Sequence, residues 1–499
     1  MAEAAVGAAG LGLAVPGVID LCIKYGHHLM TLYRDYRHAA EIDRINKFLV
    51  SLVRGEVSEM LEMFKAMYRD PIQGEQVATL VQQLYTLLAK VVQEFSPSLG
   101  VWAKVRFTFH TKKVIDRACA EIEDWHNRLF RHFMIRVLLG PPNLPANYNT
   151  AATQSAMLER VQRIKNAIMK PDVSKMLLVS FDSAVTLRAL PGSDVWETGV
   201  GGELVEYRAY SGPQALVTTQ LLVRDLAARL HEVEPSTMGL LRCRGFTPEP
   251  TQDRIALRFQ YPAGKRAAGT LQSLLVHHEN LAGVKHALSD RVLLARKLAS
   301  AVLYMHTCDF VHKNIRPDNV LIFTNNVPPG DDPAGYDYPR VIGEPFLVGF
   351  DSVRKAVAAS NMIKVEDWRK NIYLHPERHR MGVGDEYTVR HDVYSLGVVL
   401  LEIAMWGSFT DRRKGMMGRY VWKDQSTPLL PGELKERYLS LARSQVPRII
   451  GTRYADIVVS CLEGLQDEEK GGILNDQDGL VTGTAYVAQV LSKLEEISL

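Results

Sequence analysis

The sequence predicts an α+β multidomain protein, in which an N-terminal all-α helical bundle is followed by a small strand-rich lobe and a larger helical lobe. Apolar residues recur at helical spacing through residues 1–170. Short apolar strands separated by glycine and proline begin near residue 177, and helical periodicity dominates again from about residue 290. A chain of 499 residues is long enough for two or more domains.

The composition excludes several classes of protein. The chain is 46% hydrophobic and 23% charged, as in ordinary globular proteins, and its net charge of +3 gives no argument for a nucleic-acid partner. Its five cysteines form no C-x-x-C pair, which favours reduced thiols over a disulfide framework or a zinc site. We therefore expect a cytoplasmic protein that binds no nucleic acid.

Residues 1–170 contain several amphipathic stripes, interrupted by Pro71 with Gly74 and by Pro97 with Gly100. Stripes of this length bury one another as a bundle. We place the end of the bundle at 170–172, where the sequence Lys-Pro-Asp interrupts the pattern. The apolar positions of the stripes include Leu52, Val57, Met60, Leu61, Leu80, Val81, Leu84, Leu88, Ile122, Trp125 and Leu129.

The first residues need separate treatment because Ala4 to Ile19 carries no charge. This segment has 16 residues, whereas a membrane-spanning helix needs about 20, and no positive region precedes it to mark a cleaved signal. Ala4, Ala8 and Gly12 are small residues at helical spacing, which suits close packing within the bundle or, after release, in a membrane. A basic run further along fits a solvated helix face or a contact with anionic lipid, and comprises Lys104, Arg106, Lys112, Lys113 and Arg117.

The small lobe is predicted over residues 175–262 and the larger lobe over 263–499. The first long helix of the larger lobe is expected at about 290–307. The small lobe has one predicted helix over 221–233, and its predicted strands cover 177–181, 184–187, 203–210, 240–246 and 255–261.

The stretch 311–321 contains the motif to which the other motifs of residues 175–499 are related in order and spacing. It reads V-H-K-N-I-R-P-D-N-V-L, which is the frame H-R-D-x-K-x-x-N followed by an apolar strand, with His312 and Asn319 in the first and last motif positions. Asn314 stands where the pattern has its aspartate. Three motifs follow in the order and spacing of the protein-kinase signature, namely Gly349-Phe350-Asp351, Leu374-His375-Pro376-Glu377 and His391-Asp392-Val393-Tyr394-Ser395-Leu396-Gly397.

Residues 175–499 therefore resemble the protein-kinase fold. The loop at 311–319 together with Tyr-Leu-His-Pro-Glu-Arg at 373–378 is similar to the kinase-like proteins of filamentous fungi that carry an N-terminal HeLo or HeLo-like domain. The apolar start and Glu-Ile-Glu-Asp-Trp at 121–125 fit that domain. The architecture also resembles mixed-lineage kinase-domain-like proteins. The resemblance implies membrane disruption in regulated cell death, restrained by a kinase-like domain.

Two catalytic parts of the larger lobe are altered. Asn314 is neutral and cannot accept the proton of a substrate hydroxyl, a role that typically contributes ~10²–10⁴-fold to the rate. Gly349 has no side chain to bind the Mg²⁺ that the motif aspartate holds. Asp351 could point the same way and partly replace it, or could serve only as a turn or capping residue.

Two parts of the small lobe are altered as well. Arg208 stands where the lysine of V-A-I-K is expected, and arginine does not replace lysine at a buried point contact. Neither Asp225 nor Glu232 in the predicted helix is clearly its acidic partner. No glycine-rich phosphate loop precedes Arg208 at the right distance, and the glycines at 199–202 predict a hairpin turn. Four altered parts together predict a pseudokinase.

The retained residues predict a scaffold. His312 should pack and hydrogen-bond within the loop, and Asp392 should accept hydrogen bonds from backbone amides of that loop. Asn319 could hold a metal ion or cap the loop, and Arg316 could contact a phosphate or pair with an acid. If ATP and Mg²⁺ bind at all, the candidate residues are Arg208, Asn319 and Asp351, with Asn319 at the metal; Asp392 and Glu377 are predicted to be structural.

The favoured hypothesis is a signalling protein of fungal regulated cell death or incompatibility. In this hypothesis the helical bundle acts on anionic membranes or by self-association, and the pseudokinase restrains it until an upstream receptor or kinase signals. The protein would be cytoplasmic and recruited to membranes on activation. The alternatives are a divergent, active Ser/Thr-type protein kinase that binds ATP, and a non-catalytic interaction scaffold.

Overall fold

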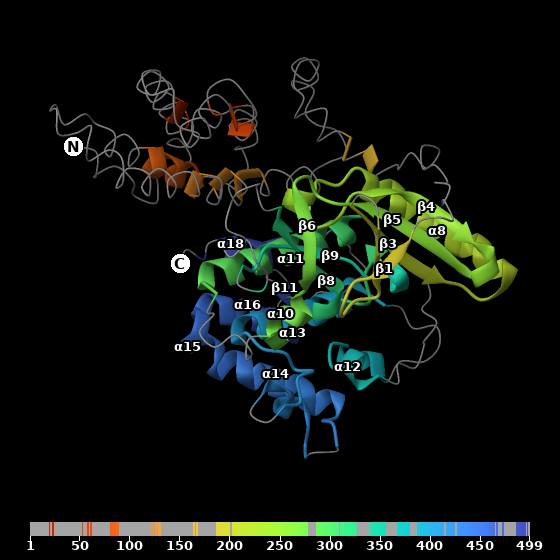
Figure 1. Cartoon of the computed structure of the whole chain (residues 1–499). Coiled ribbons are helices and arrows are strands. Elements are labelled where there is room, and N and C mark those ends of the chain that lie inside the picture. Colours follow the sequence, from red (N-terminus) through yellow and green to blue (C-terminus); the bar gives the residue numbers. More distant parts are fainter. Residues whose placement is uncertain are drawn as a thin grey trace, which may run out of the picture. The chain divides into compact units, whose positions relative to one another are not determined.

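The protein is described here by a computed structural model (Figure 1), which divides into two compact units, Met1–Val137 and Leu138–Leu499. Residues 168–185 lie outside the described part, so the predicted boundary near 170–175 stays a prediction. The described residues are 19, 22–23, 52, 57–58, 60–61, 80–88, 121–122, 125–126, 128–130, 163–164, 166–167, 186–199, 202–277, 286–308, 310–326, 339, 341–355, 367–379, 387–413, 416–424, 427–464, 466–467, 472–473, 486–495 and 497.

The described residues of the first unit are all helical. Trp125 is fully buried, and its indole Nε1 donates a hydrogen bond of 2.8 Å to the carbonyl oxygen of Leu80 in the helical segment 80–88. The apolar positions in the predicted stripes are buried wherever they are described, which is the packing expected of amphipathic helices. The bundle as a whole stays a prediction, because the small residues at 4, 8 and 12 and the basic run at 104–117 lie outside the described residues.

A five-stranded antiparallel sheet in the order β1-β2-β3-β5-β4 forms the small lobe. The β2–β3 hairpin closes at Gly202, whose φ of 75° is the left-handed conformation that glycine adopts without strain, in agreement with the turn predicted at 199–202. The strands are β1 (Leu187–Ala189), β2 (Val195–Thr198), β3 (Glu203–Ala209), β4 (Cys243–Glu249) and β5 (Arg254–Gln260).

One helix, α8 (Gly212–His231), follows β3 and packs against β4. It begins nine residues before the predicted start, because Pro213 in the first turn fixes the helical φ and the preceding Ser211 is extended. Val223, Leu226 and Leu230 are buried at helical spacing. Strand β2 was not predicted, since its four residues are too few to show a clear alternation. A short helix, α9 (Pro235–Met238), leads into β4.

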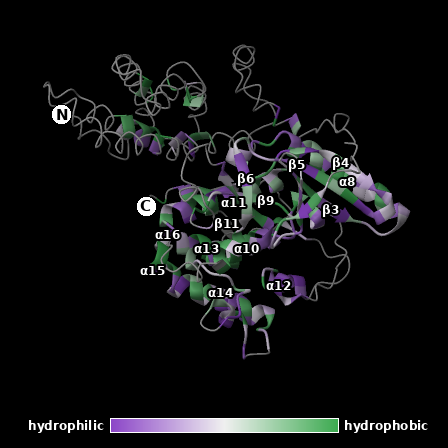
Figure 2. Cartoon of the chain, viewed as in Figure 1, coloured by the Kyte–Doolittle hydropathy of each residue, from purple (hydrophilic) through white to green (hydrophobic). Residues whose placement is uncertain are grey.

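The larger lobe is built around α13 (Val389–Met405), which is buried along nearly its whole length and packs against α11 (Leu288–Thr307) and α16 (Thr452–Glu463). Hydrophobic residues follow the helices of this lobe in Figure 2. Within the described residues, no helix is long and apolar enough to cross a membrane. The other helices are α10 (Leu271–His277), α12 (Trp368–Asn371), α14 (Pro431–Ser444), α15 (Val446–Ile450) and α18 (Lys493–Glu495).

Two small sheets position the motifs of the larger lobe. The three-stranded sheet β6-β8-β9 places the loop that precedes β8 beside the loop that follows β9. The pairing of β7 with β10 joins the start of the first loop to the end of the second. Together these pairings bring residues 312–319 against 349–351. The strands are β6 (Lys265–Thr270), β7 (Phe310–Val311), β8 (Val320–Asn325), β9 (Glu344–Leu347), β10 (Arg354–Lys355), and a further pair, β11 (Gln466–Asp467) with β12 (Gly472–Ile473).

Candidate active site

Asp392, at the start of α13, holds the loop at 311–319. Its carboxylate accepts hydrogen bonds from the backbone amides of His312 at 2.6 Å and Lys313 at 2.9 Å. The Tyr387 hydroxyl donates to it at 3.1 Å, and His306 Nε2 lies 3.0 Å away. Burial raises the pKa of this fully buried acid, but His306 and the backbone amides outweigh burial and hold the pKa below its ordinary value. Asp392 is thus a charged anchor for the loop.

His312 packs within the core. Its ring meets the Phe350 ring edge to face at 5.4 Å between centroids, and Phe350 stacks in turn on Phe259 of β5 at 5.5 Å. Burial lowers the pKa of His312 to about 4, so the imidazole is neutral at pH 7. The stack joins the loop, the Gly-Phe-Asp motif and the small lobe into one apolar column, which gives His312 a structural role.

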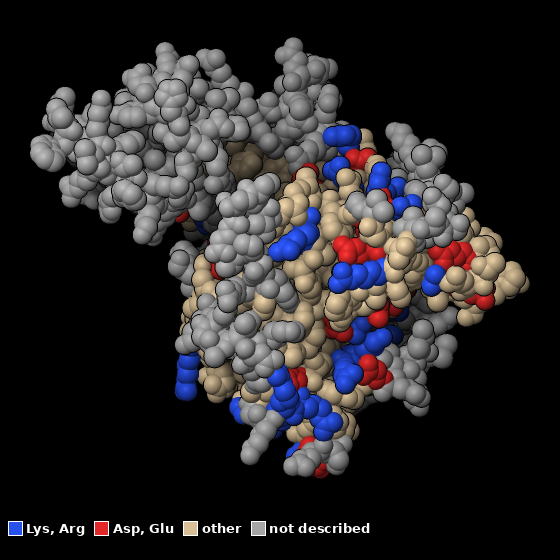
Figure 3. Space-filling view, in the orientation of Figure 1, with Lys and Arg blue, Asp and Glu red and all other residues tan. Residues whose placement is uncertain are grey.

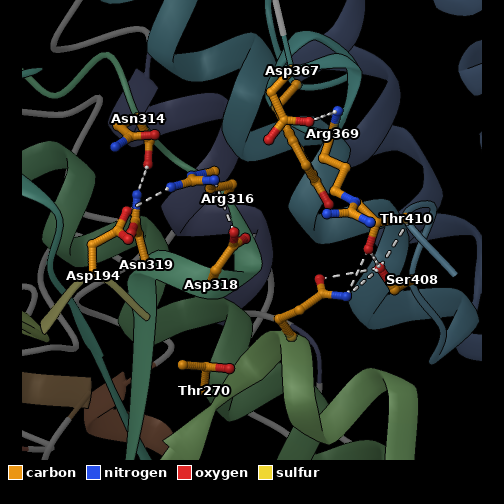
Figure 4. A network of polar contacts seen from close by, with 12 residues as sticks. Asp194, Thr270, Asn314, Arg316, Asp318, Asn319, Asp367, Arg369, Ser408 and Thr410 are labelled. Atoms are coloured by element: carbon orange, nitrogen blue, oxygen red, sulfur yellow. Dashed lines mark hydrogen bonds and ion pairs between the residues drawn. The ribbon is translucent and has the colours of Figure 1, made fainter. Parts of the chain in front are cut away.

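The loop asparagines bond to one another and to the Gly-Phe-Asp motif. Asn319 Nδ2 donates to the carbonyl oxygen of Asn314 at 2.8 Å (Figure 4), and Asn314 Nδ2 donates to Asp351 Oδ1 at 3.0 Å. Gly349 has a φ of 89°, and a Cβ at this position would lie 2.5–2.8 Å from the Asn319 amide atoms. Asn319 therefore fills the space in which a side chain at position 349 would stand.

Glu206 in β3 contacts the Gly-Phe-Asp motif, and the sequence analysis did not predict a role for it. Its Oε2 accepts hydrogen bonds from the backbone amides of Gly349 at 3.0 Å and Phe350 at 2.8 Å. Among the described residues, Oε1 makes no hydrogen bond. Burial raises the pKa of this carboxyl to about 8, since the two amide bonds offset only part of the desolvation cost. An acid is therefore buried, largely uncharged at pH 7, against the position where kinases hold Mg²⁺.

Arg208 lies on the same face of β3, two residues after Glu206. Its guanidinium donates to the carbonyl oxygens of Phe350 at 3.1 Å and Val353 at 2.7 Å. Asp225 in α8 pairs with Arg229 one helical turn away at 3.1 Å, and Glu232 follows the end of that helix. The structure thus gives Arg208 hydrogen bonds that hold the segment after Gly349 against the sheet.

Two other predicted site residues form ion pairs. Arg316 Nη1 bonds Asp318 at 2.8 Å, and its Nη2 lies 3.6 Å from Asp194, as Figure 4 shows. Glu377 receives a hydrogen bond from Arg390. On the face shown in Figure 3, acidic side chains lie among the basic ones over the small lobe. The acid pairing left open for Arg316 is therefore the contact that the structure contains.

A signal for Glu206 was present in the sequence. It is an ionisable residue between apolar neighbours in a predicted strand, on the same face as Arg208 because side chains alternate along a strand. What the sequence could not provide was the distant segment, Gly349 and Phe350, that contacts it.

Comparison with known proteins supports a kinase-like domain. Residues of this chain are 23% identical over 243 positions to mitogen-activated protein kinase kinase 7 of Arabidopsis thaliana, covering 48% of the chain and 66% of that protein. A MAP kinase kinase of Saccharomyces cerevisiae is 27% identical over 169 residues, which is 33% of the chain and 27% of the relative.

A protein kinase and PP2C-like domain-containing protein of Arabidopsis thaliana is 32% identical over 129 residues, covering 25% of the chain and 18% of the relative. The chain thus spans less than two thirds of the length of these relatives. No protein-family profile matches it. The sheet, the motif loops and these similarities together define a kinase-like domain in the second part of the chain.

Proposed function

We propose that the protein is a regulatory pseudokinase, in which the kinase-like domain has a signalling role and does not transfer phosphate. The observation that carries this proposal is Glu206, whose carboxyl group is bound to the amides of Gly349 and Phe350. Nucleotide phosphates and their Mg²⁺ ions need cationic and anionic partners in definite places. An uncharged acid on β3 offers no cation to the phosphates, and Gly349 offers no side-chain ligand to Mg²⁺.

The other altered positions act in the same direction. Asn314 cannot accept a proton, and its side-chain amide is bonded to Asp351, the acid two residues after Gly349. Asn319 donates to the Asn314 carbonyl oxygen and packs against Gly349. The residues that would bind a metal ion or orient a hydroxyl are therefore bonded to each other.

A divergent active kinase is the second candidate. It is favoured by the relatives, whose names describe protein kinases, and by Asn319 and Asp351, which both lie within hydrogen-bonding distance of Asn314. In that case Asp351 would supply the metal ligand that Gly349 lacks.

Incubation of the full chain with radiolabelled ATP and Mg²⁺ separates the two candidates. We expect no incorporation of phosphate above that of an Asn319→Ala control, and no rise in the unfolding temperature with Mg²⁺-ATP, because tight binding would add RT ln(1 + [L]/Kd) to the stability. Autophosphorylation that Asn319→Ala abolishes would establish the active kinase instead.

We further propose that the helical first unit is the effector, acting by self-association or on anionic membranes in a fungal cell-death response, and that the pseudokinase restrains it in the cytoplasm until a receptor or kinase signals. The support is the sequence of the first unit and its resemblance to HeLo-type domains. Dye-loaded anionic liposomes test it: residues 1–170 should cause leakage that the full chain does not, and inactivity of both would contradict the effector role.

A further inference from the structure

A second cluster of ionisable side chains lies outside the motif loops at 312–319 and 349–351. His375 precedes the short 3-10 helix η7 (Pro376–His379), Glu377 lies within it, and His391 lies in the first turn of α13. One potential ligand atom from each of these three residues lies within 4.8 Å of those of the other two. His375 Nδ1 and His391 Nε2 are each 3.7 Å from Glu377 Oε2, which is too long for a hydrogen bond.

His391 is buried with a nitrogen that faces this cluster. The residue is 1% exposed, and within the part of the chain that the structure describes its Nε2 makes no hydrogen bond. Buried polar atoms almost always have a partner, so this nitrogen has room for a water molecule or an ion as its partner. The neighbours of His391 in this cluster are His375 and Glu377. Imidazole nitrogen and carboxylate oxygen are ligand types that Zn²⁺ prefers.

We propose that His375, Glu377 and His391 form a binding site for a divalent transition-metal ion of the Zn²⁺ type, with water as the fourth ligand. Tetrahedral Zn²⁺ with bonds of about 2.0–2.2 Å separates its ligand atoms by roughly 3.4 Å. The two separations of 3.7 Å are already close to this value. A small inward rotation of the exposed Glu377 side chain and of one ring completes the site.

The hydrogen bonds of both rings bear on metal binding. Neutral imidazole binds metal ions through the nitrogen that carries no proton. His375 Nδ1 accepts a hydrogen bond of 3.3 Å from the backbone amide of Glu377, so this nitrogen carries no proton, and a metal ion would take the place of that amide. With a metal ion at His391 Nε2, its Nδ1 donates to the Thr388 hydroxyl 3.1 Å away, in place of accepting from the Thr388 amide.

Arg390 is the competitor for this site. It donates a hydrogen bond to Glu377 Oε2, the same oxygen that faces both imidazoles. Arg378 and Lys435 add further positive charge nearby, as their influence on His391 and His375 shows. An incoming cation must displace Arg390 from Glu377, so the affinity for the ion is set by the balance between the ligands and this guanidinium. Removing the Arg390 charge should therefore strengthen binding.

Zinc titration of the untagged full chain, in competition with a chromophoric chelator, tests the proposal. The wild-type chain should bind Zn²⁺ at this site, and His375→Gln and His391→Gln should each weaken that binding by about tenfold or more. His379→Gln is the matched control, because His379 lies on the same 3-10 helix outside the cluster and should leave the affinity unchanged. Mg²⁺ should not compete, since it prefers oxygen ligands.

Arg390→Gln provides a readout that loss of folding cannot imitate. It should strengthen Zn²⁺ binding by about two- to fivefold, the worth of one exposed charge pair. The thermal unfolding of each variant without metal shows whether that variant folds. If a histidine variant does not fold, the proposal is tested by whether Arg390→Gln binds Zn²⁺ more tightly than the wild-type chain. Absence of zinc binding by the wild-type chain, or equal affinity of wild-type and folded histidine variants, would overturn the proposal.

Discussion

Asp392 and Glu206 are two buried carboxyl groups that each accept hydrogen bonds from two backbone amides, yet they serve the domain differently. Asp392 uses both oxygens and has Tyr387 and His306 as further partners. Glu206 receives both amides on one oxygen. The pKa of Asp392 is accordingly lowered and that of Glu206 raised to about 8. The fully partnered acid anchors the loop as a charged group, whereas the acid with one unpartnered oxygen is largely uncharged at pH 7.

The largest effect is expected for Asp392→Ala. The substitution leaves the buried amides of His312 and Lys313 without an acceptor and removes the partner of His306. We expect the free energy of unfolding to fall by about 3–5 kcal/mol at pH 7, measured by urea denaturation. Asp351→Ala, which removes an exposed acid bonded to Asn314, should cost less than about 1 kcal/mol. Similar losses of unfolding free energy for the two variants would show that Asp392 anchors the loop no more strongly than Asp351 does.

A smaller effect is expected for Gly349→Ala. The added methyl group would clash with the Asn319 amide. Alanine would also be strained at the left-handed φ of this position. We expect a loss of about 2–4 kcal/mol. Gly264→Ala is the control, because Gly264 has a φ of 72° with no atom near the Cβ position and should lose only about 1 kcal/mol. Equal melting temperatures for the two variants would show that Asn319 moves aside freely.

A change of another kind, in the pH dependence of stability, is expected for Glu206→Gln. The pKa of Glu206 is raised from 4.5 to about 8 on folding. The unfolded chain therefore releases this proton first, and the contribution of Glu206 to stability declines from pH 4.5 to about 8 and is constant above. Asp392 has the opposite sign: its lowered pKa contributes stability above its unfolded pKa, and the contribution is lost as acid protonates the folded state.

Denaturation of wild-type chain and Glu206→Gln at several pH values measures this contribution. The difference in unfolding free energy between the two should change steadily between pH 5 and 8 in favour of the glutamine variant. Glu402→Gln is a useful comparison, because burial also raises the pKa of Glu402 to about 8 at a site far from the Gly-Phe-Asp motif. A constant difference for Glu206→Gln across this range would mean that the acid stays charged in the fold.

The fold was predictable where periodicity and motif order agreed. The strands at β3 and β5 and the helix α11 lie close to their predicted ranges, since each is rich in apolar residues and is bounded by turn or motif residues. The start of α8 was placed too late, because Thr218, Thr219 and Gln220 mask the helical pattern and Pro213 was not taken as a helix start. Strands β2 and β6 carry too few apolar residues to be predicted.

The candidate site was predictable at its retained positions only. The contact of Asp392 with loop amides follows from the motif and from the need of buried amides for an acceptor. The role of Glu206 depends on a contact with residues 349–350 that no local pattern encodes. The cluster of His375, Glu377 and His391 likewise becomes visible only when η7 and the start of α13 are placed side by side.

The close approach of Gly349 to Asn319 also limits how this sequence can evolve. A carboxylate at position 349 would require Asn319 to shrink or rotate first, and Asn319 is tied to the Asn314 carbonyl oxygen. A single substitution to the metal-binding motif therefore carries a cost in stability. A prior change at position 319 would remove that cost, so the order in which the two positions change decides how stable the intermediate is.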